Sequence, residues 1–499
     1  MQKKFFSNLV FLVVLNLLVK PFWVFGIDRT VQNRVGVEDY GLYFALFNFT
    51  FLFNILLDAG INNFNNRNIS QHHQLLTKQF SGIASLKIIL LLLYVTVIIS
   101  SGYLIGYRDD QIFLLAWIGL NHGLALFILY MQSNISGLQM FRTNSIISVL
   151  DRVLMIIFCS LLLWGNITEQ PFRIEWFIMV QTISYLITLA AAFIVILPRI
   201  ERVFPKWDLP FFIAILKHSF PFALLILLMT IYIRADTVML ERMLPDGKIQ
   251  AGIYAQSYRI LEAANMFAYL FPTLLLPMFS KMLATTEKSR FSPQESEFAQ
   301  KQNRFQKING LLTFSFSILF CAATVLCAIT LFYSKPILGI LYRQHFEQGP
   351  AILTILMFTF IGFAVMYTFS TLLTAHGRLS ELNTMAFAAV TLNITMNFFF
   401  IPHFGALGCS IAALVTQFFA ATVQIILVRS IFSFHFERQW LIRTAGFCIG
   451  VFGTGYIVSK FGFNPVSGGA IIITAASLLF FVCGIISFTD IKKYFSEMV

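Results

Sequence analysis

The sequence predicts an all-α, polytopic membrane protein of about fourteen transmembrane helices, and three observations predict this fold class. The chain has 499 residues, of which 58% are hydrophobic and only 12% charged. Soluble domains carry roughly 25% charged residues. Apolar runs of about 20 residues, the length that crosses about 30 Å of hydrocarbon, recur from one end of the chain to the other. Lys and Arg are about twice as frequent on alternate connections, as the positive-inside rule requires.

The apolar runs define the expected spans in chain order. The first follows Lys3 and Lys4 and has no small-residue cleavage pattern, so we expect a retained helix rather than a cleaved signal peptide. The eighth contains Pro272 and Pro277 and should kink or end early. The fourteen spans lie at about 5–27, 40–63, 80–103, 110–133, 145–165, 174–198, 211–232, 250–280, 308–333, 351–374, 381–401, 406–429, 440–458 and 467–487.

The basic connections indicate that both chain ends face the cytoplasm of a bacterial cell, with the spans in the inner membrane. The longest connection, about 281–307, is polar and is expected on the same side. We expect no extramembrane domain, because no other connection reaches twenty residues. The net charge of +12 follows from these basic connections, so nucleic acid is not an expected partner.

Two short patterns recur six spans apart. Asp28-Arg29 precedes Gly41-Leu42-Tyr43 in the first half. Arg234-Ala235-Asp236 precedes Gly252-Ile253-Tyr254 in the second half. Duplicated halves are typical of secondary transporters. We therefore expect three parts: an N-terminal lobe of six helices at 1–200, a C-terminal lobe of six helices at 201–430, and two additional helices at 431–499.

Sequence motifs for catalysis are missing. The chain contains no HExxH, no GxSxG and no Walker loop, so no catalytic residues and no enzyme activity are predicted. The six cysteines lie within apolar runs and form no CxxC pair. We therefore expect no metal site and no cofactor.

Ionisable side chains inside the spans are the functional candidates, because each costs several kcal/mol unless it faces water or a partner. Arg259 and Glu262 are three residues apart and share one face of the eighth span. They form either a structural ion pair or an anion-binding site in which the acid positions the Arg or carries a coupling proton. Lys20 precedes the helix-kinking Pro21, and it either lines a cavity or snorkels to the helix end.

The other candidates lie nearer the membrane faces. Asp58 and Asp151 lie toward the cytoplasmic ends of their spans. Asp151 and the adjacent Arg152 cannot share a helix face, so at least one needs a partner elsewhere. The outer ends of the first and seventh spans carry matching charges that form either an outer gate or an ordinary charged helix end: Asp28, Arg29, Arg234 and Asp236.

Specific motifs cluster in residues 8–70. They comprise Asn16 to Arg29 with its Lys20-Pro21 step, Tyr40-Gly41-Leu42-Tyr43, Leu57-Asp58-Ala59-Gly60-Ile61 and Arg67-Asn68-Ile69. With the fourteen-helix count and the repeated halves, these motifs resemble the polysaccharide flippases of the multidrug/oligosaccharidyl-lipid/polysaccharide exporter superfamily.

The resemblance implies two six-helix lobes around a central cavity. It implies a substrate consisting of an undecaprenyl-diphosphate-linked oligosaccharide, a surface polysaccharide or lipopolysaccharide precursor. Alternating access would carry this lipid from the cytoplasmic to the periplasmic leaflet. Lys20, Arg29, Arg67 and Arg259 fall where related lipid II flippases place cavity cations, and with Arg234 they are the expected diphosphate-binding residues. The expected coupling or gating acids are Asp28, Asp58, Asp151, Asp236 and Glu262.

The expected partners are the lipid-linked oligosaccharide, membrane lipids and polysaccharide polymerase or assembly proteins, with H⁺ or Na⁺ as coupling ion. Two alternatives remain open. An ion-coupled small-molecule or drug exporter of the same fold would favour acidic over basic cavity residues. A membrane glycan polymerase or ligase would usually carry a sizeable external loop or an aspartate cluster at the membrane face.

Overall fold

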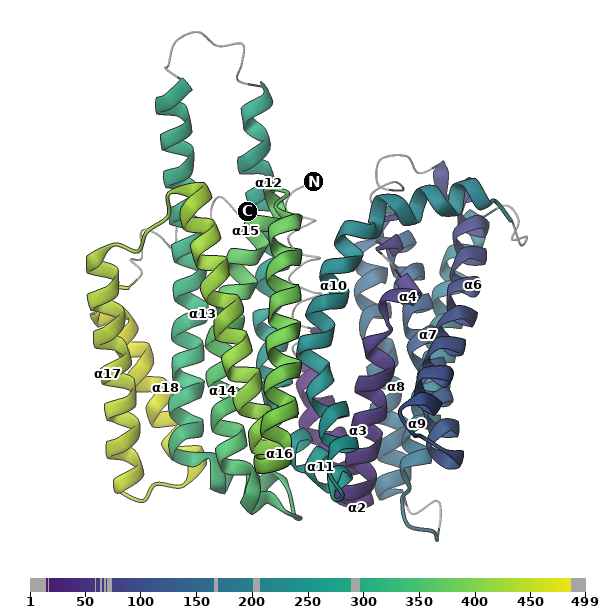
Figure 1. The fold of residues 1–499 in the computed structure, drawn as a ribbon, viewed down its shortest axis with the longest axis horizontal. Coiled ribbons are helices and arrows are strands. Elements are labelled where there is room, and N and C mark those ends of the chain that lie inside the picture. Colours follow the sequence, from purple (N-terminus) through teal and green to yellow (C-terminus); the bar gives the residue numbers. More distant parts are fainter. Residues whose placement is uncertain are drawn as a thin grey trace. The chain divides into compact units, whose positions relative to one another are not determined.

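The computed structural model describes residues 15–16, 18–58, 60–62, 65–66, 69, 74–165, 169–200, 207–288 and 297–485. All regular structure within these residues is helical, which confirms the predicted all-α class (Figure 1). The chain divides into two compact units, Met1–Ala255 and Gln256–Val499, called unit 1 and unit 2 below. The predicted lobe boundaries near residues 200 and 430 rest on the sequence repeat, which the division into compact units does not test. They stay a prediction.

Unit 1 contains the helices up to Ala255, within α11. They are η1 (Trp23–Asp28), α2 (Arg29–Val35), α3 (Val37–Leu52), α4 (Ile55–Asp58), α6 (Leu75–Leu104), α7 (Asp109–Gly137), α8 (Phe141–Trp164), α9 (Ile174–Ile196), η2 (Leu197–Arg199), α10 (Leu209–Met243) and the start of α11 (Gly247–Ala268).

Unit 2 contains the rest of α11 and all later helices. They are α12 (Leu270–Lys288), α13 (Glu297–Leu341), η4 (Phe346–Gln348), α14 (Gly349–Val365), η5 (Met366–Ser370), α15 (Thr371–Ala375), α16 (Leu379–Phe432), α17 (Arg438–Lys460) and α18 (Pro465–Val482).

Eleven helices in the described residues are long and apolar enough to cross a membrane, so the predicted count of fourteen is not confirmed. One of the eleven, α16, has 54 residues and would be about 80 Å long if it were straight. It breaks at Gly405, whose φ of 55° and ψ of −133° are not helical. Its two arms correspond to the separate spans predicted at 381–401 and 406–429.

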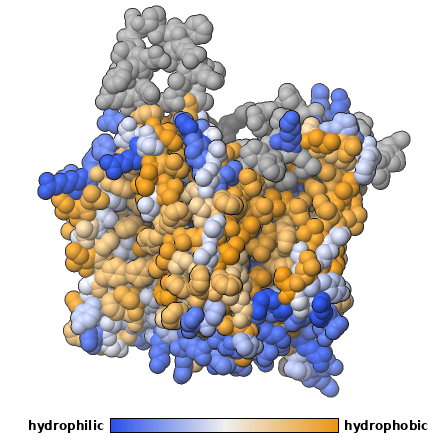
Figure 2. Space-filling view, viewed as in Figure 1, coloured by the Kyte–Doolittle hydropathy of each residue, from blue (hydrophilic) through white to orange (hydrophobic). Residues whose placement is uncertain are grey.

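The distribution of hydrophobic residues on the surface suits contact with lipid. On the face shown in Figure 2, hydrophobic residues cover the middle of the helices and hydrophilic residues gather at their ends. Large apolar side chains such as Leu104, Phe461 and Val482 are exposed. Such exposure would be costly in water but is favourable against hydrocarbon tails.

The eighth span is interrupted, as predicted, and the described parts of the connection after it are helical. The helix is interrupted at Tyr269, between α11 and α12. In an uninterrupted helix the ring of Pro272 would clash with the carbonyl of Ala268, four positions earlier, which explains the position of the break. The connection predicted at about 281–307 is helical at both of its ends. Helices α12 and α13 extend into it, to Lys288 and from Glu297, and project beyond their neighbours in unit 2 (Figure 1).

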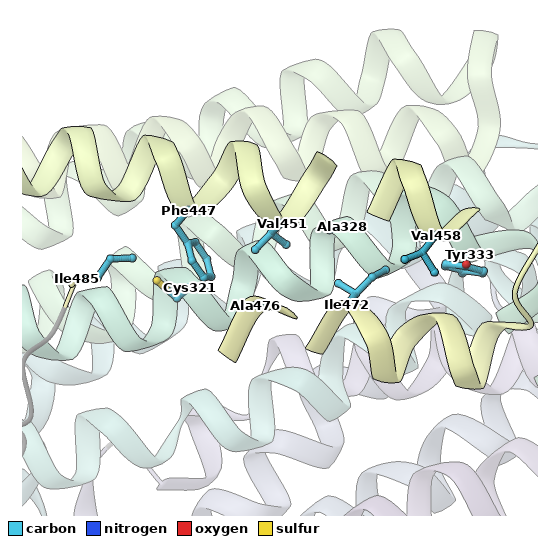
Figure 3. Close-up of a cluster of buried hydrophobic side chains, with 9 residues drawn as sticks. All are labelled: Cys321, Ala328, Tyr333, Phe447, Val451, Val458, Ile472, Ala476 and Ile485. Carbon is cyan, nitrogen blue, oxygen red and sulfur yellow. The ribbon is translucent and has the colours of Figure 1, made fainter. Parts of the chain in front are cut away.

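The last two helices pack on α13 through a buried apolar cluster, shown in Figure 3. Gly455 and Gly468 keep the contact close, because a Cβ at either would meet the rings of Phe332 and Tyr333 respectively. In a bilayer this kind of close packing is a principal source of helix association. The buried members of the cluster are Cys321, Ala328, Tyr333, Phe447, Val451, Val458, Ile472, Ala476 and Ile485.

The break in α16 generates a stability prediction. Gly405→Ala places a Cβ on a backbone conformation that favours glycine, and we expect it to cost about 1–3 kcal/mol. The measurement is the apparent melting temperature of the purified protein in detergent. Gly453→Ala is the matched control, since it lies within α17 with nothing within 4 Å of an added Cβ. Equal melting temperatures for the two variants would contradict this account of the break.

Candidate functional site

The first helix carries an irregularity that positions its charged residues. Pro21 supplies no N–H, and the following residues Trp23–Asp28 adopt π-helical spacing. Single π-helical turns inside α-helices recur at functional sites. The helix then continues as α2 to Gly36, where φ is 94°. The predicted connection between the first two spans is therefore almost entirely helical.

Lys20 lies on this helix beside a second basic residue. The guanidinium of Arg152, on α8, lies over the ring of Trp23 with its Cζ 5.5 Å from the ring centroid. Asp151 contacts Arg152 at 3.6 Å, and Lys20 is within electrostatic range of both residues. Within the described part of the chain, Lys20 makes no hydrogen bond and no ion pair. The structure thus brings together the predicted residues Lys20 and Asp151 and adds Arg152.

Arg29 and Asp28 are neighbours in sequence but differ in environment. The Asp28 carboxylate is 3% exposed and accepts a 2.7 Å hydrogen bond from the Tyr40 hydroxyl. The buried Nε of Arg29 has no hydrogen-bond partner among the described residues. Burial of an unpartnered polar atom costs on the order of 1–3 kcal/mol. A ligand that accepts from Arg29 would remove this cost.

The second repeat places Asp236 in a similar setting. Its carboxylate is buried in α10 and accepts from the Tyr254 hydroxyl of α11 at 3.4 Å. Arg234, two residues earlier, donates to the Asn48 side chain of α3 at 3.1 Å and lies over the Phe51 ring at 5.1 Å. Both residues were expected outside the seventh span. They lie inside α10, because this helix continues to Met243 instead of ending near 232.

The two repeated glycines meet each other where α3 and the start of α11 cross, in unit 1. A Cβ at Gly41 would overlap the Lys248 carbonyl, and a Cβ at Gly252 would overlap the Val37 carbonyl. The crossing therefore has backbone against backbone, which only glycine permits.

Two further contacts join the same segments of unit 1. The Gln32 side chain donates to the Gly252 carbonyl at 3.1 Å, and Lys248 pairs with Glu38 at 3.7 Å. The repeat glycines, the two buried aspartates and these contacts lie at the helix ends predicted to be external. We call this set the outer crossing.

Sequence reasoning missed Glu241. Its carboxylate is 5% exposed, is paired with Arg242 through two bonds of 2.6 Å and accepts from the Tyr107 hydroxyl at 3.0 Å. The Arg242 guanidinium also lies 4.0 Å from the Tyr107 ring centroid. This cluster ties the end of α10 to the connection between α6 and α7. Its only sequence signal was a Glu-Arg step in a segment expected to be a loop.

Asp58 has a different partner from any predicted cation. Its carboxylate pairs at 2.9 Å with Lys87 of α6, whose side chain is 2% exposed. Lys87 also lies 5.7 Å from the Tyr130 ring centroid. Removing one partner of a buried ion pair is costly, so Asp58 and Lys87 hold α4 against α6.

Arg259 and Glu262 form the intrahelical pair that their spacing predicts. The Arg259 Nη1 lies 2.7 Å from the Glu262 Oε2, and both side chains are mostly buried in unit 2. Lys20, Arg29 and Arg234 belong to unit 1, whereas Arg259 belongs to unit 2. Arg67 lies outside the described residues, so its predicted role stays a prediction.

Residues 8–283 match the family model described as "Polysaccharide biosynthesis protein". No curated protein sequence matches the chain. Among solved structures, the chain resembles the lipid II flippase MurJ in its inward closed conformation, at 13% identity and a TM-score of 0.70. That likeness covers 95% of this chain and 98% of the other.

Two further solved structures share the fold. An inward-facing multidrug resistance MATE family transporter of the MOP superfamily matches at 12% identity and a TM-score of 0.62, over 82% of this chain and 94% of that one. A MOP superfamily transporter from Pyrococcus furiosus, described as having a binding pocket of reverse polarity, matches at 12% identity and a TM-score of 0.52, over 85% and 93%. At these identities the likeness concerns the fold.

The outer crossing generates the next prediction. Gly41→Ala should separate α3 from the start of α11, because the added Cβ meets backbone that cannot rotate away. We expect a cysteine placed at the buried Val37 to react about tenfold faster with a membrane-impermeant maleimide, for a shift of about 1.4 kcal/mol. Gly469→Ala, with open space around its Cβ, is the control. An unchanged rate in Gly41→Ala would show that the crossing tolerates a methyl group.

Proposed function

The chain belongs to the polysaccharide biosynthesis protein family, whose model matches just over half of it, and on that premise we propose that it is a flippase for an anionic, lipid-linked glycan. The proposed substrate is an undecaprenyl-diphosphate-linked oligosaccharide, a precursor of surface polysaccharide or lipopolysaccharide. The protein moves it from the cytoplasmic to the periplasmic leaflet of a bacterial inner membrane. Both chain ends face the cytoplasm, and polysaccharide polymerase or assembly proteins receive the product.

One observation supports an anionic substrate above all others. Each predicted acid in the described residues has a partner, whereas Lys20 has neither a hydrogen bond nor an ion pair there. An ammonium group inside an apolar span needs a counter-charge. A diphosphate supplies that charge and several acceptor oxygens. The contacts of the acids are Asp28–Tyr40, Asp58–Lys87, Asp151–Arg152, Asp236–Tyr254 and Glu262–Arg259.

The outer crossing supports alternating access. Its residues come from the helices that begin the two repeats, and they are in contact at the helix ends predicted to be external. Transport to the periplasmic leaflet then requires these contacts to separate. Closure by a glycine crossing and one exposed ion pair involves few strong bonds, which suits a contact that breaks in every cycle.

The Arg259–Glu262 pair supports a role in coupling. As long as Glu262 is ionised, it neutralises Arg259 and competes with a phosphate. We propose that Glu262 takes up H⁺, becomes neutral and releases Arg259 to the diphosphate. Na⁺ is the other proposed coupling ion, and it would act by pairing with the Glu262 carboxylate.

The alternatives differ in what deletion of the gene would do. A flippase-deficient cell loses surface glycan and keeps the lipid-linked intermediate in its inner leaflet. A drug exporter of the same fold would instead alter resistance to cationic compounds, and a polymerase or ligase would alter glycan length or attachment. Unchanged surface glycan and unchanged lipid-linked intermediates on deletion would refute the flippase.

The cation in unit 2 gives a direct test in cells. Arg259→Ala should abolish glycan export at normal expression, because the diphosphate loses a charged, hydrogen-bonding partner. Arg259→Lys should be only partly tolerated, because an ammonium cannot make the bidentate contact of a guanidinium. Surface glycan is measured by immunoblot. Full export by Arg259→Ala would remove Arg259 from the binding site.

The outer crossing gives a second test. Glu38 and Lys248 are both exposed, so Cys at both positions in a cysteine-free background can be bridged by a short bifunctional thiosulfonate. We expect the bridge to stop export and a reducing agent to restore it. Arg378→Cys with Glu381→Cys, a pair at the start of α16 whose side chains are 46% and 33% exposed, is the matched control and should export normally when bridged. Undiminished export by the bridged Glu38–Lys248 pair would contradict opening at this crossing.

A further inference from the structure

We propose that the Nε2 of His122, on α7 in unit 1, binds a hydrogen-bond donor of the transported glycan, either a hydroxyl or the N–H of an acetamido group. The inference rests on the proposed function and deepens it, because it concerns the sugar rather than the diphosphate. His122 is not among the residues assigned above to the substrate.

The last turn of α3 determines where the Tyr94 hydroxyl donates its proton. The turn is tighter than an α-helix, because the Asn54 N–H bonds to the Phe51 carbonyl at 3.0 Å instead of to the Thr50 carbonyl. The Thr50 carbonyl accepts from the Phe53 N–H at 3.3 Å and has a second lone pair. The Tyr94 hydroxyl of α6 donates to this carbonyl at 2.9 Å, which uses its only proton.

This hydrogen bond fixes the tautomer of His122. The Tyr94 oxygen also lies 3.4 Å from the His122 Nδ1. Because the Tyr94 proton points to Thr50, the hydroxyl oxygen can only accept from His122, so Nδ1 carries a proton. In the neutral imidazole the other nitrogen then has none. The Nε2 of His122 is therefore a hydrogen-bond acceptor.

This acceptor has no donor in the described part of the chain. The His122 side chain is 8% exposed, and its Nε2 is buried without a hydrogen-bond partner. Buried polar atoms are nearly always partnered, and an unpartnered one costs stability. A sugar can supply the missing donor through a hydroxyl or an acetamido N–H. The diphosphate cannot, because its ionised oxygens only accept hydrogen bonds.

Two aromatic rings of α3 cover the imidazole. Phe47 and Phe51 are four residues apart and share one helix face. Their ring centroids lie 4.8 and 5.4 Å from that of His122. Both Phe side chains are only partly buried, whereas His122 is buried. Aromatic walls around one placed polar atom are typical of ligand sites.

Arg234 connects this site with the transport route. Its guanidinium lies 5.1 Å from the centroid of the Phe51 ring and is half-buried. A charged side chain inside a span faces the helix bundle or water rather than lipid. Phe51 contacts both Arg234 and His122, and it lies in the last turn of α3, where helices fray most readily. Displacement of the Phe51 ring would therefore give a sugar access to Nε2 from the side of Arg234.

The test compares two amide replacements of His122. His122→Gln can place its side-chain oxygen near the position of Nε2, whereas the shorter His122→Asn reaches only the position of Nδ1. The first variant keeps the proposed acceptor and the second removes it at similar polarity. Binding to the purified full-length protein in detergent is measured by native mass spectrometry. The probes are undecaprenyl diphosphate and the same lipid carrying one N-acetylglucosamine or one galactose.

We expect the wild-type protein to bind the sugar lipids more tightly than undecaprenyl diphosphate. His122→Asn should weaken sugar-lipid binding by about three- to tenfold, the effect of one neutral hydrogen bond, and leave undecaprenyl diphosphate binding unchanged. His122→Gln should keep most of the sugar affinity. A loss for both sugars identifies a hydroxyl as the donor, and a loss confined to the N-acetylglucosamine lipid identifies the acetamido N–H.

Three results would overturn the sugar site. The first is wild-type affinity for both sugar lipids in His122→Asn, since Nε2 would then hold no more than a water molecule. The second is an equal loss of all three lipids with a lower melting temperature, since His122 would then only pack the helices. The third is a wild-type protein that binds neither sugar lipid more tightly than undecaprenyl diphosphate.

Tyr94→Phe keeps the proposal testable if His122→Asn folds poorly. This variant removes the acceptor of the Nδ1 proton, so the imidazole can move its proton to Nε2. We expect a partial loss of sugar-lipid affinity with unchanged binding of undecaprenyl diphosphate. Unchanged affinity for the sugar lipids in Tyr94→Phe would overturn the tautomer on which the site depends.

The two proposals fail in distinguishable ways. If export depends on the gene and the wild-type protein binds the sugar lipids, but the His122 variants bind them normally, only the sugar site is refuted. If deletion leaves surface glycan and lipid-linked intermediates unchanged, the flippase itself is refuted, whatever the His122 variants bind.

Discussion

A charge inside the hydrocarbon layer must have a partner, and the rest of this structure depends on that constraint. Lys87 has Asp58, Arg242 has Glu241, and Arg259 has Glu262. The Asp58–Lys87 pair joins two helices, and in the other two pairs opposite charges on one helix neutralise each other. Lys20 is different, because within the described residues it has no such bond and has a second cation close by. This excess of positive charge marks the part of unit 1 where we expect an anion to bind.

A second constraint is the close approach of helices. At the outer crossing, the glycines that begin the second helix of each repeat contact the opposite backbone, and each excludes a side chain. Similar glycine contacts pack α17 and α18 onto α13. Few bonds stabilise the outer crossing besides the glycine contacts themselves. The packing of α17 and α18 on α13 also includes an extended apolar cluster. We therefore expect the outer crossing to open while α13, α17 and α18 move together.

Much of the fold could be predicted from the sequence, because hydrophobic runs of span length and the bias in basic connections need no tertiary information. The all-α class, the break near Pro272 and the pairing of Arg259 with Glu262 all follow from local patterns. The end of α10 at Met243 does not, because its last turns are polar and their sequence predicts a loop. These turns are stabilised by contacts of Glu241 and Arg242 with Tyr107, in the connection between α6 and α7, and of Asp236 with Tyr254 on α11.

The candidate site was predictable only in part, for the same reason. Lys20 and Asp151 could be predicted because they are ionisable residues within apolar spans, which the sequence alone shows. The approach of Arg152 to Trp23 depends on how α8 packs on η1, and no spacing along the chain encodes it. The partner of Asp58 likewise comes from α6.

The central claim is that this protein moves a diphosphate-linked glycan lipid across a bilayer. The most direct measurement reconstitutes the purified protein in vesicles with an undecaprenyl-diphosphate-linked disaccharide that carries a fluorophore, and then bleaches the outer leaflet with dithionite. Our account predicts bleaching beyond the fraction reached in protein-free vesicles, and competition by unlabelled undecaprenyl diphosphate. Bleaching that stops at the protein-free fraction, under every ion gradient applied, would contradict it.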